Sequence, residues 1–405
     1  MPNDAPAGKT DALRRGPYDR HDAGPSALTK PLTAARLALV HDWLTGYRGG
    51  EKCLAVLCRH FPDAPLYTLL HVKGSLPDVI ERMDIRPSFL QRLPRIDRYY
   101  RYTLPLMPLA ARWRIDNCDL VVSLSHAVAK AARPPGGVPH VCYCFTPMRY
   151  AWHMRESYFA ERVRGIKARV VDRLLAALRA WDRRTASRVT HFIAISETVR
   201  RRIAECYGRE SVVIYPPVDT NFYTPDPAVA REDYYLVISA FAPYKRVDLA
   251  VEACNRLGRR LIVIGSGQDA ERLKAMAGPT IQFLGWQPDE VLRDHLRRCR
   301  ALLFPGEEDF GIVPVEAHAC GAPVIAYVRG GATETVIPQG REGATGAWFE
   351  EQTLDSLVAA MQNLEKEADR LDPEAARKQA LKFDQSRYES ELLGYLKRVL
   401  NETAK

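Results

Sequence analysis

An α/β fold of two doubly wound domains is predicted by three features of this sequence. The chain has 405 residues, more than the length of about 250–300 at which one hydrophobic core stops growing. Short runs rich in β-branched residues alternate with longer amphipathic stretches, which is the pattern of parallel strands joined by helices. Pro216 and Pro217 interrupt that pattern near the middle of the chain. We therefore expect two Rossmann-like domains that face a central cleft.

Ten near-continuous apolar runs are the predicted strands, because strands covered by helices on both faces do not alternate between apolar and polar residues. Those in the first half are Leu37–His41, Asp119–Leu124, Val138–Cys144, His191–Ile195 and Val212–Tyr215. Those in the second half are Tyr235–Ser239, Arg260–Ile264, Ile281–Leu284, Ala301–Phe304 and Pro323–Ala326. The carboxyl ends of these strands form the edge where such domains bind ligands.

Composition sets the predicted domain boundaries. Residues 1–33 are rich in Ala, Pro, Asp, Gly and Arg and lack the apolar stretch of a signal peptide, so we expect a disordered leader. The first domain is expected over residues 34–216 and the second over 217–382, because consecutive prolines block both helix and sheet. The periodic segment 383–405 is expected to be a helix that packs back toward the first domain.

Charge and cysteine usage narrow the class of partner. The formal net charge of +9 favours anionic partners, but no nucleic-acid-binding signature accompanies it, so nucleic acid is not expected. No apolar run reaches the roughly 18–20 residues of a membrane span. The nine cysteines include no C-x-x-C pair, which indicates reduced thiols in a cytoplasmic protein without a bound metal.

The sharpest motif begins directly after the predicted strand Ala301–Phe304. A helix is expected to start near Pro314, so the backbone N–H groups around Phe310, Gly311 and Ile312 would point out of its N-terminus. Such an N-terminus binds a diphosphate. Gly311 would let the ligand approach the backbone closely.

Two carboxylates flank this helix start. Glu316 lies one turn into the helix and can accept both hydroxyls of a ribose, while Glu308 precedes it and can do the same for a hexose. The alternative is a capped helix with two solvated acids.

Two adjacent cations, Lys245 and Arg246, follow the first strand of the second half. Cations are normally unfavourable at a helix start, so a phosphate partner explains this pair better than a surface accident. Negative charge that develops on a leaving pyrophosphate would be stabilised there.

Three further features could complete a nucleotide-sugar site. Gly285 and Trp286 follow the strand Ile281–Leu284 and offer main chain and an aromatic wall to a base, although a Trp that fills the core is the alternative. Gly49 and Gly50 follow the first strand of the first half, where their N–H groups could face the diphosphate from the opposite domain. A plain turn is the alternative there.

Together these motifs resemble glycosyltransferase family 4, which has the GT-B fold, over about Leu37 to Leu400. The element Glu308-x7-Glu316 with its embedded Phe-Gly-Ile is the most specific mark of that family. Four segments are similar to sequences of a subgroup of bacterial mannosyltransferases that act in surface-polysaccharide assembly: Ser125–Lys130, Thr146–Trp152, Val213–Asp219 and Arg329–Val336.

The resemblance implies a retaining hexosyltransferase that needs no cofactor. The donor would be GDP-mannose, and the acceptor a polyprenyl-diphosphate-linked glycan of exopolysaccharide or lipopolysaccharide assembly. The implied catalytic residues are Glu308, Lys245 and Arg246. The implied donor-binding residues are Gly49, Gly50, Lys245, Arg246, Gly285, Trp286, Glu308, Phe310, Gly311, Ile312 and Glu316.

The chain departs from the family pattern at two places. Many relatives carry Gly-Arg where this chain has Ser239-Ala240, and Arg246 could replace that missing cation. The subgroup has an active-site His where this chain has Phe145, which can neither accept a hydrogen bond nor relay a proton. His126 and His153 lie near in sequence and could substitute, or could be structural. In the front-face mechanism proposed for retaining enzymes of this fold, the leaving phosphate itself takes the acceptor proton.

Two basic stretches, residues 92–114 and 162–188, mix Arg with apolar and aromatic residues. Both could lie on an anionic bilayer, which would make the protein peripheral on the inner face of the cytoplasmic membrane. The alternative is core-facing helices with solvated basic backs. Two rival functions stay open: a catalytically inactive sugar-nucleotide-binding subunit of an assembly complex, and a GT-B nucleotide-sugar epimerase.

Overall fold

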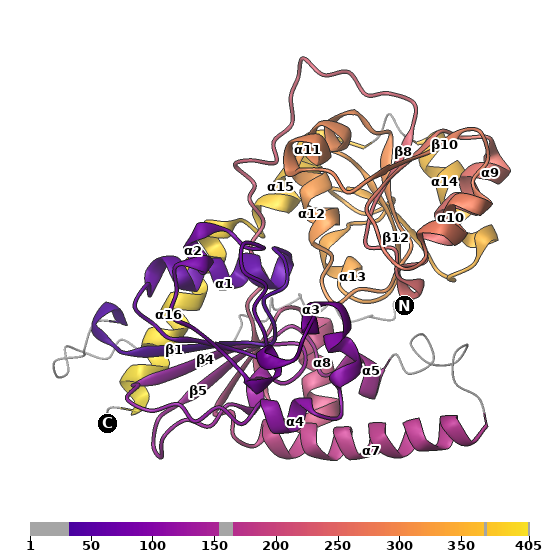
Figure 1. Ribbon diagram of the computed structural model, residues 1–405. Coiled ribbons are helices and arrows are strands. Elements are labelled where there is room, and N and C mark those ends of the chain that lie inside the picture. Colours follow the sequence, from indigo (N-terminus) through magenta and orange to yellow (C-terminus); the bar gives the residue numbers. More distant parts are fainter. Residues whose placement is uncertain (1–31, 154–164, 368–370, 404–405) are drawn as a thin grey trace, which may run out of the picture.

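The computed structural model describes residues 32–153, 165–367 and 371–403 and contains two parallel sheets, one in each half of the chain (Figure 1). The predicted α/β class with two doubly wound domains is confirmed. Residues 1–31 of the expected leader lie outside the described residues. The chain already has structure at Leu32, which begins the short 3₁₀ helix η1 (Leu32–Ala34).

The first domain contains a seven-stranded sheet in the order β3-β2-β1-β4-β5-β6-β7. All its strand pairs are parallel. The strands are β1 (Leu37–His41), β2 (Leu66–Thr68), β3 (Ile85–Pro87), β4 (Leu120–Ser125), β5 (His140–Cys144), β6 (His191–Ala194) and β7 (Ser211–Val213). The order reverses between β1 and β4, so the ligand-binding switch point of this domain lies at their carboxyl ends.

The second domain contains a six-stranded sheet in the order β10-β9-β8-β11-β12-β13. Its strand pairs are also all parallel. The strands are β8 (Tyr235–Ile238), β9 (Leu261–Ile264), β10 (Ile281–Gly285), β11 (Ala301–Phe304), β12 (Val324–Tyr327) and β13 (Gly346–Phe349). Here the switch point lies between β8 and β11.

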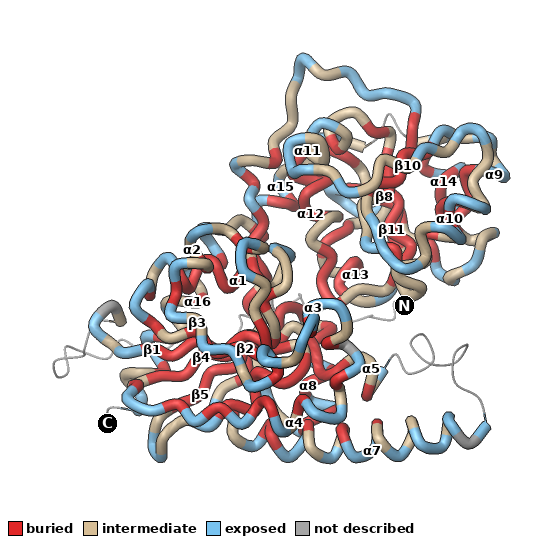
Figure 2. Tube along the Cα trace, in the orientation of Figure 1, coloured by how far each residue is buried: buried red, intermediate tan, exposed pale blue. Residues whose placement is uncertain are grey.

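Helices cover both sheets, and the buried segments concentrate in the strands and the helix faces against them (Figure 2). Those of the first domain are α1 (Gly49–His60), α2 (Asp78–Glu81), η2 (Phe89–Arg92), α3 (Ile96–Tyr99), η3 (Tyr100–Thr103), α4 (Met107–Ala110), η4 (Ala129–Ala131), α5 (Arg149–Trp152), α7 (Ile166–Ala186) and α8 (Glu197–Tyr207). Those that follow are η5 (Pro243–Lys245), α9 (Val247–Leu257), α10 (Ala270–Met276), α11 (Asp289–Arg298), α12 (Ile312–Ala319), α13 (Ala332–Thr335), α14 (Leu354–Lys366), α15 (Pro373–Leu381) and α16 (Gln385–Thr403).

All ten predicted strands are present, with ends that differ by at most two residues. Three strands escaped prediction: β2, β3 and β13. The strand β13 has the apolar sequence GAWF but begins with Gly, which is depleted in strands. The sequences LYT of β2 and IRP of β3 are only three residues long and are not continuous apolar runs. A pattern that short cannot be told from a loop.

The last helix, α16, returns to the first domain (Figure 1). The chain passes between the domains at two adjacent places, which are joined by a bridge between Val218 and Asp384. The Val218 N–H donates a hydrogen bond to the Phe383 carbonyl over 3.1 Å. Tyr388 of α16 is buried against Tyr143 of β5, with ring centroids 5.7 Å apart. Two chain segments therefore connect the domains.

A buried ion pair fixes the loop after β4 beneath the cleft. The Lys130 ammonium, 1% exposed, binds the Asp182 carboxylate of α7 and donates to the Ala127 carbonyl over 2.9 Å. Asp182 also accepts hydrogen bonds from the Trp152 indole (2.9 Å) and the Tyr207 hydroxyl (2.8 Å). Removing one partner of such a pair typically costs about 3–5 kcal/mol of stability. This cluster therefore holds the segments Ser125–Lys130 and Thr146–Trp152 against the same helix, α7.

Candidate active site

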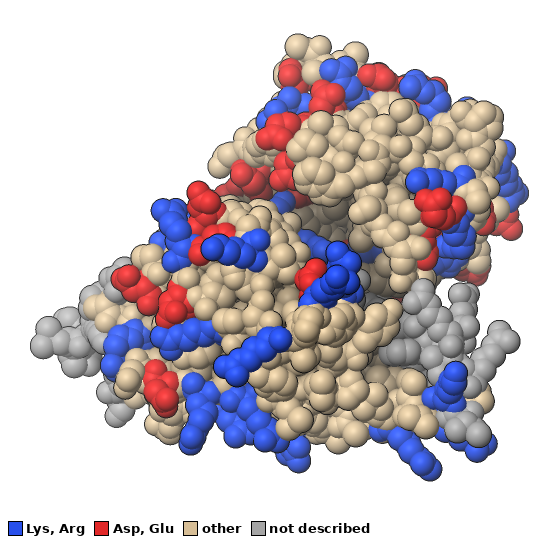
Figure 3. All heavy atoms as spheres, viewed as in Figure 1, with Lys and Arg blue, Asp and Glu red and all other residues tan. Residues whose placement is uncertain are grey.

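The N-termini of two helices meet across the space between the domains. Gly49 begins α1 in the first domain, and Ile312 begins α12 in the second. A Cβ added to Gly49 would lie 2.5 Å from the Ile312 Cδ1 atom, so any larger residue would require the Ile312 side chain to shift. Figure 3 shows the surface hollowed between the domains. The positive ends of two helix dipoles favour an anion there.

The start of α12 differs slightly from the prediction. The helix begins at Ile312 rather than near Pro314, and Gly311 precedes it with φ +88°, a conformation that favours glycine. The Phe310 side chain is buried between Tyr215 and Phe383, with ring centroids 5.7 and 5.4 Å away. Phe310 therefore anchors the loop, and only its backbone is left for the predicted donor contact.

Lys245 and Glu308 lie together, as a shared site requires. The Lys245 Nζ atom is 2.5 Å from the Glu308 Oε2 atom. The second predicted cation differs: the Arg246 guanidinium faces the Asp248 carboxylate at 3.2 Å and the Gln352 side chain at 3.4 Å. Arg246 thus lies at the start of α9 with an acid of its own helix as its partner.

Glu316 is buried and paired across the domains. Its Oε1 atom lies 3.2 Å from the Lys52 Nζ atom of α1. Burial raises the pKa of Glu316, although Lys52 opposes that rise. Burial by itself lowers the pKa of Lys52, but Glu316 and Asp289 outweigh it and raise the pKa. A diol that binds both Glu316 oxygens would therefore share this carboxylate with Lys52 or displace it.

The predicted base-reading residues are open to ligand. Trp286 is 76% exposed, so it does not fill the core. The neighbouring Gly285 closes β10, and its carbonyl accepts a hydrogen bond from the Gly265 N–H over 2.8 Å. The turns after β9 and β10 therefore lie side by side at the carboxyl edge of the second sheet.

Polar contacts between the domains surround the Glu308 loop. The buried Asp309 carboxylate binds two arginines of the first domain, Arg149 and Arg202. Its carbonyl accepts a hydrogen bond from the Ser196 hydroxyl over 2.5 Å. The Glu334 carboxylate of α13 accepts from the backbone N–H groups at the start of α8, over 2.8 and 3.0 Å. These contacts fix how the two halves of the site face each other.

Phe145, at the position of the expected active-site His, lies between two imidazoles. Its ring centroid is 6.3 Å from that of His41 and 6.2 Å from that of His126. A Cβ added to Gly50 would lie 3.3 Å from the Phe145 ring, so Phe145 packs against the first turn of α1. His153 lies elsewhere, beside Cys206 of α8, with its Nε2 atom 3.4 Å from the thiol sulfur.

Asp42 organises the loop after β4. It is completely buried, and its carboxylate accepts hydrogen bonds from four consecutive backbone N–H groups, those of His126, Ala127, Val128 and Ala129, over 2.6–2.9 Å. The His126 Nδ1 atom lies 3.0 Å from its Oδ2 atom. Burial alone would raise the pKa of Asp42, but the charge and hydrogen bonds of His126 lower it well below the ordinary value.

Sequence reasoning missed Lys52, Asp42, Asp309 and Arg149 as site residues. Lys52 lies two residues after the Gly49-Gly50 pair, and Asp309 lies inside the Glu-x7-Glu element, so proximity to a motif was the available signal. Their partners are 84 to 264 residues away in the chain, and spacing within a motif does not reveal such distant contacts.

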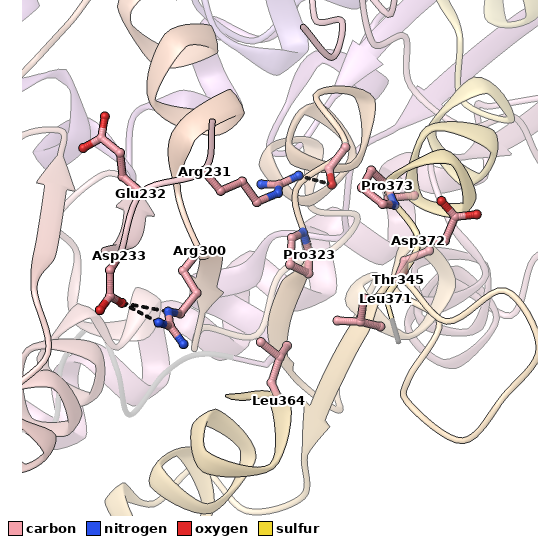
Figure 4. A pocket seen from close by; sticks show the side chains of 12 residues that line it. Arg231, Glu232, Asp233, Arg300, Pro323, Thr345, Leu364, Leu371, Asp372 and Pro373 are labelled. Atoms are coloured by element: carbon pink, nitrogen blue, oxygen red, sulfur yellow. Dashed lines mark hydrogen bonds and ion pairs between the residues drawn. The ribbon is translucent and has the colours of Figure 1, made fainter. Parts of the chain in front are cut away.

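One cavity lies away from these residues, and another borders the Glu308 loop. One of about 410 Å³ lies at the amino ends of the second sheet, where Arg300 pairs with Asp233 and Arg231 donates to the Gly321 carbonyl (Figure 4). The other, of about 540 Å³, lies between α8 and the end of β12 and includes His153. Among the described residues, no three His, Cys, Asp or Glu side chains form a group that could hold a metal ion.

The fold and the cleft are those of a family of sugar-transferring enzymes. A model described as glycosyltransferase family 4 matches residues 47–222, and one described as glycosyl transferases group 1 matches residues 225–382. Each covers one domain, and together they span most of the chain. The chain belongs to glycosyltransferase family 4.

Named relatives match parts of the chain. A GDP-mannose-dependent alpha-(1-6)-phosphatidylinositol monomannoside mannosyltransferase of Mycolicibacterium smegmatis is 31% identical over 200 residues, 42% of this chain and 51% of the relative. A D-inositol 3-phosphate glycosyltransferase of Geodermatophilus obscurus is 29% identical over 241 residues, 44% of this chain and 54% of the relative. The chain thus spans about half the length of these curated relatives.

Solved structures of similar fold cover nearly the whole chain. Sucrose-phosphate synthase of Thermosynechococcus elongatus gives a TM-score of 0.67 at 17% identity, over 91% of this chain and 99% of that one. Anabaena HepE in complex with UDP gives 0.62 at 17% identity, over 89% and 99%. At this identity the likeness establishes the GT-B fold alone.

Asp42→Asn is expected to destabilise the first domain in a pH-dependent way. Because the folded pKa of Asp42 is depressed, its carboxylate stabilises the fold above the unfolded pKa of about 3.9 and loses that effect as pH falls. Hydrogen bonds to a charged group contribute about 1.5–3 kcal/mol. In urea unfolding, the free energy of unfolding of Asp42→Asn should therefore be lower than that of the wild type by about that amount. The difference should be equal at pH 7 and pH 5 and smaller near pH 3.5.

The exposed Asp116 supplies the control, since Asp116→Asn removes the same charge from the same domain without those bonds. If the loss in free energy of unfolding for Asp42→Asn stays constant down to pH 3.5, the account of Asp42 as an ionised, hydrogen-bonded carboxylate is wrong.

Proposed function

We propose that the protein transfers mannose from GDP-mannose, with retention of configuration, to a polyprenyl-diphosphate-linked glycan in exopolysaccharide or lipopolysaccharide assembly. The observation that carries the proposal is the Lys245–Glu308 pair at 2.5 Å beside the facing N-termini of α1 and α12. A cation, a carboxylate and two helix ends suit a diphosphate joined to a sugar. The relatives named as GDP-mannose-dependent support the choice of donor.

The parts of the donor would lie along the carboxyl edge of the second sheet. The base would stack near Trp286, which is exposed at the end of β10. The ribose would bind Glu316 once Lys52 moves away, and the released ammonium could then pair with a phosphate. The hexose would lie against Glu308, on the side that faces the first domain.

Transfer would then follow the front-face course. The acceptor hydroxyl oxygen bonds to the anomeric carbon on the face from which the diphosphate leaves, and the bond from that carbon to the phosphate oxygen breaks. The acceptor proton passes to the leaving phosphate oxygen. Lys245 and the N–H groups of the two helix ends stabilise the negative charge that grows there. This chemistry needs no cofactor and no metal, because the residues supply the electrostatic stabilisation.

A surface that includes α4 and α7 supports contact with a lipid-linked acceptor. Leu109 of α4 is 47% exposed and Val170 of α7 is 60% exposed. These helices share a buried cluster through Met107 and Leu175. Figure 3 shows Lys and Arg side chains along the lower edge of the first domain, where α7 lies in Figure 1. No helix in the described part of the chain is long and apolar enough to cross a membrane. We propose peripheral binding to the inner face of the cytoplasmic membrane.

Transfer is tested by incubating the protein with GDP-mannose labelled in the sugar and with lipid-linked glycans extracted from membranes. Labelled mannose should enter the lipid fraction as the α-anomer, and Lys245→Ala should lower the rate by about 10²–10³, the cost of losing one group that stabilises developing charge. Arg272→Ala, which removes an exposed cation of the same domain, is the control. Wild-type protein that binds the donor without transfer would favour the inactive-subunit alternative, and a released sugar-nucleotide isomer would favour the epimerase.

Membrane binding is tested by cosedimentation with vesicles of phosphatidylglycerol and of phosphatidylcholine. Binding should require the anionic lipid and weaken with salt. Replacing Lys167, Arg169 and Arg173 of α7 by Gln should weaken it by about 100-fold, since each cation near such a surface contributes about 1 kcal/mol. The control replaces Arg272, Lys274 and Arg298 of the second domain by Gln and loses the same charge. Equal weakening in both variants would contradict the proposed surface.

A further inference from the structure

We propose that His126 is the group of the first domain that hydrogen-bonds the transferred hexose. It would supply, from the end of β4, the polar contact that Phe145 cannot make from the end of β5. The inference rests on the proposed function, because it presumes a sugar between Glu308 and the first domain.

Asp42 holds the His126 ring in one orientation. The Nδ1 atom lies 3.0 Å from the Asp42 Oδ2 atom, and the four backbone hydrogen bonds to the same carboxylate fix that oxygen in place. In the neutral ring, a hydrogen on Nδ1 leaves Nε2 as an acceptor. Within the described residues, Nε2 has no hydrogen-bond partner. The geometry is that of an oriented imidazole with one nitrogen unused.

Aromatic rings hold the imidazole from two sides while it stays accessible. Trp43 meets the His126 ring edge-on with centroids 4.4 Å apart, and Phe145 lies 6.2 Å away. The His126 side chain is nevertheless 33% exposed, whereas its partner Asp42 is completely buried. A buried orienting carboxylate behind a partly exposed imidazole positions a group toward a ligand.

The position of His126 relative to the phosphate-binding ends follows from contacts. Phe145 packs against Gly50 in the first turn of α1, and Gly49 beside it meets Ile312 of α12. The Phe145 ring therefore lies between His126 and the helix ends where the diphosphate is proposed to bind. It also lies at the β1–β4 switch point of the first sheet, the edge where ligands of such domains bind.

The other two candidate imidazoles are less suited. His41 is 1% exposed, and its Nε2 atom faces Glu51 at 3.4 Å, so no sugar can reach it. The Nε2 atom of His153 faces the Cys206 sulfur at 3.4 Å, in the cavity that Arg202 and Glu307 line, and burial lowers the pKa of His153. Neither is both oriented and accessible.

The test compares free nucleotide with sugar nucleotide in His126→Gln and His126→Phe, with His153→Gln as the matched control. Calorimetric titration should give an unchanged Kd for GDP in all variants, since His126 contacts only the sugar. For GDP-mannose, His126→Phe should weaken binding by about 5- to 10-fold, the loss of one hydrogen bond. His126→Gln should lose less, because its amide keeps polar atoms, and mannose transfer should fall in the same order.

A structural role would give a different result. If His126 only supports the loop after β4, its variants would weaken GDP and GDP-mannose alike and lower the Tm, which would overturn the inference. Unchanged GDP-mannose binding and transfer in both His126 variants would overturn it too. Wild-type protein that binds neither ligand would overturn the donor assignment itself, so the two failures are distinguishable.

Discussion

The buried carboxylate of Asp309 is the constraint on which the geometry of the cleft depends. Two arginines of the first domain, Arg149 and Arg202, neutralise it across the domain boundary. A buried carboxylate that loses its partners costs several kcal/mol, so this group opposes separation of the domains. Asp309 directly follows Glu308, and the same contacts therefore place the Lys245–Glu308 pair opposite the first domain. The loop that carries Glu308 is thus also the loop that joins the two domains.

The cleft balances its charges without a ligand. Lys245 faces Glu308, and Lys52 faces Glu316, so each acid that suits a sugar hydroxyl is paired with an ammonium. A nucleotide sugar would exchange partners in both pairs: the hydroxyls would take the carboxylates, and the diphosphate would take the cations. Such an exchange keeps buried charges paired throughout, which limits the cost of desolvation. Arg246 is likewise paired with an acid, the Asp248 carboxylate at the start of α9.

Much of this arrangement could be predicted from the sequence. Long apolar runs showed ten strands, and motifs directly after them lie at the carboxyl edges, because parallel strands bring those loops together. The three-residue strands β2 and β3 left no usable pattern, and the Gly at the start of β13 obscured that strand. Long-range partners also escaped: nothing local links Lys52 to Glu316, or Asp42 to the four N–H groups after β4. Residue type did not show that Phe310 faces the core or that Arg246 turns to its own helix. Those outcomes depend on tertiary packing rather than on spacing.

The central claim, a nucleoside-diphosphate-sugar site between α1 and α12, is tested most directly by thermal unfolding with GDP, UDP, ADP and dTDP, each alone and as a mannosyl or glucosyl form. A ligand at about 100 times its Kd should stabilise the fold by about 2.7 kcal/mol. We expect a Tm rise selective for GDP and GDP-mannose that is lost in Glu316→Ala and kept in Glu271→Ala, which removes an exposed acid of the same domain. A rise with UDP forms alone would contradict the base assignment. No rise with any nucleotide would contradict the site itself.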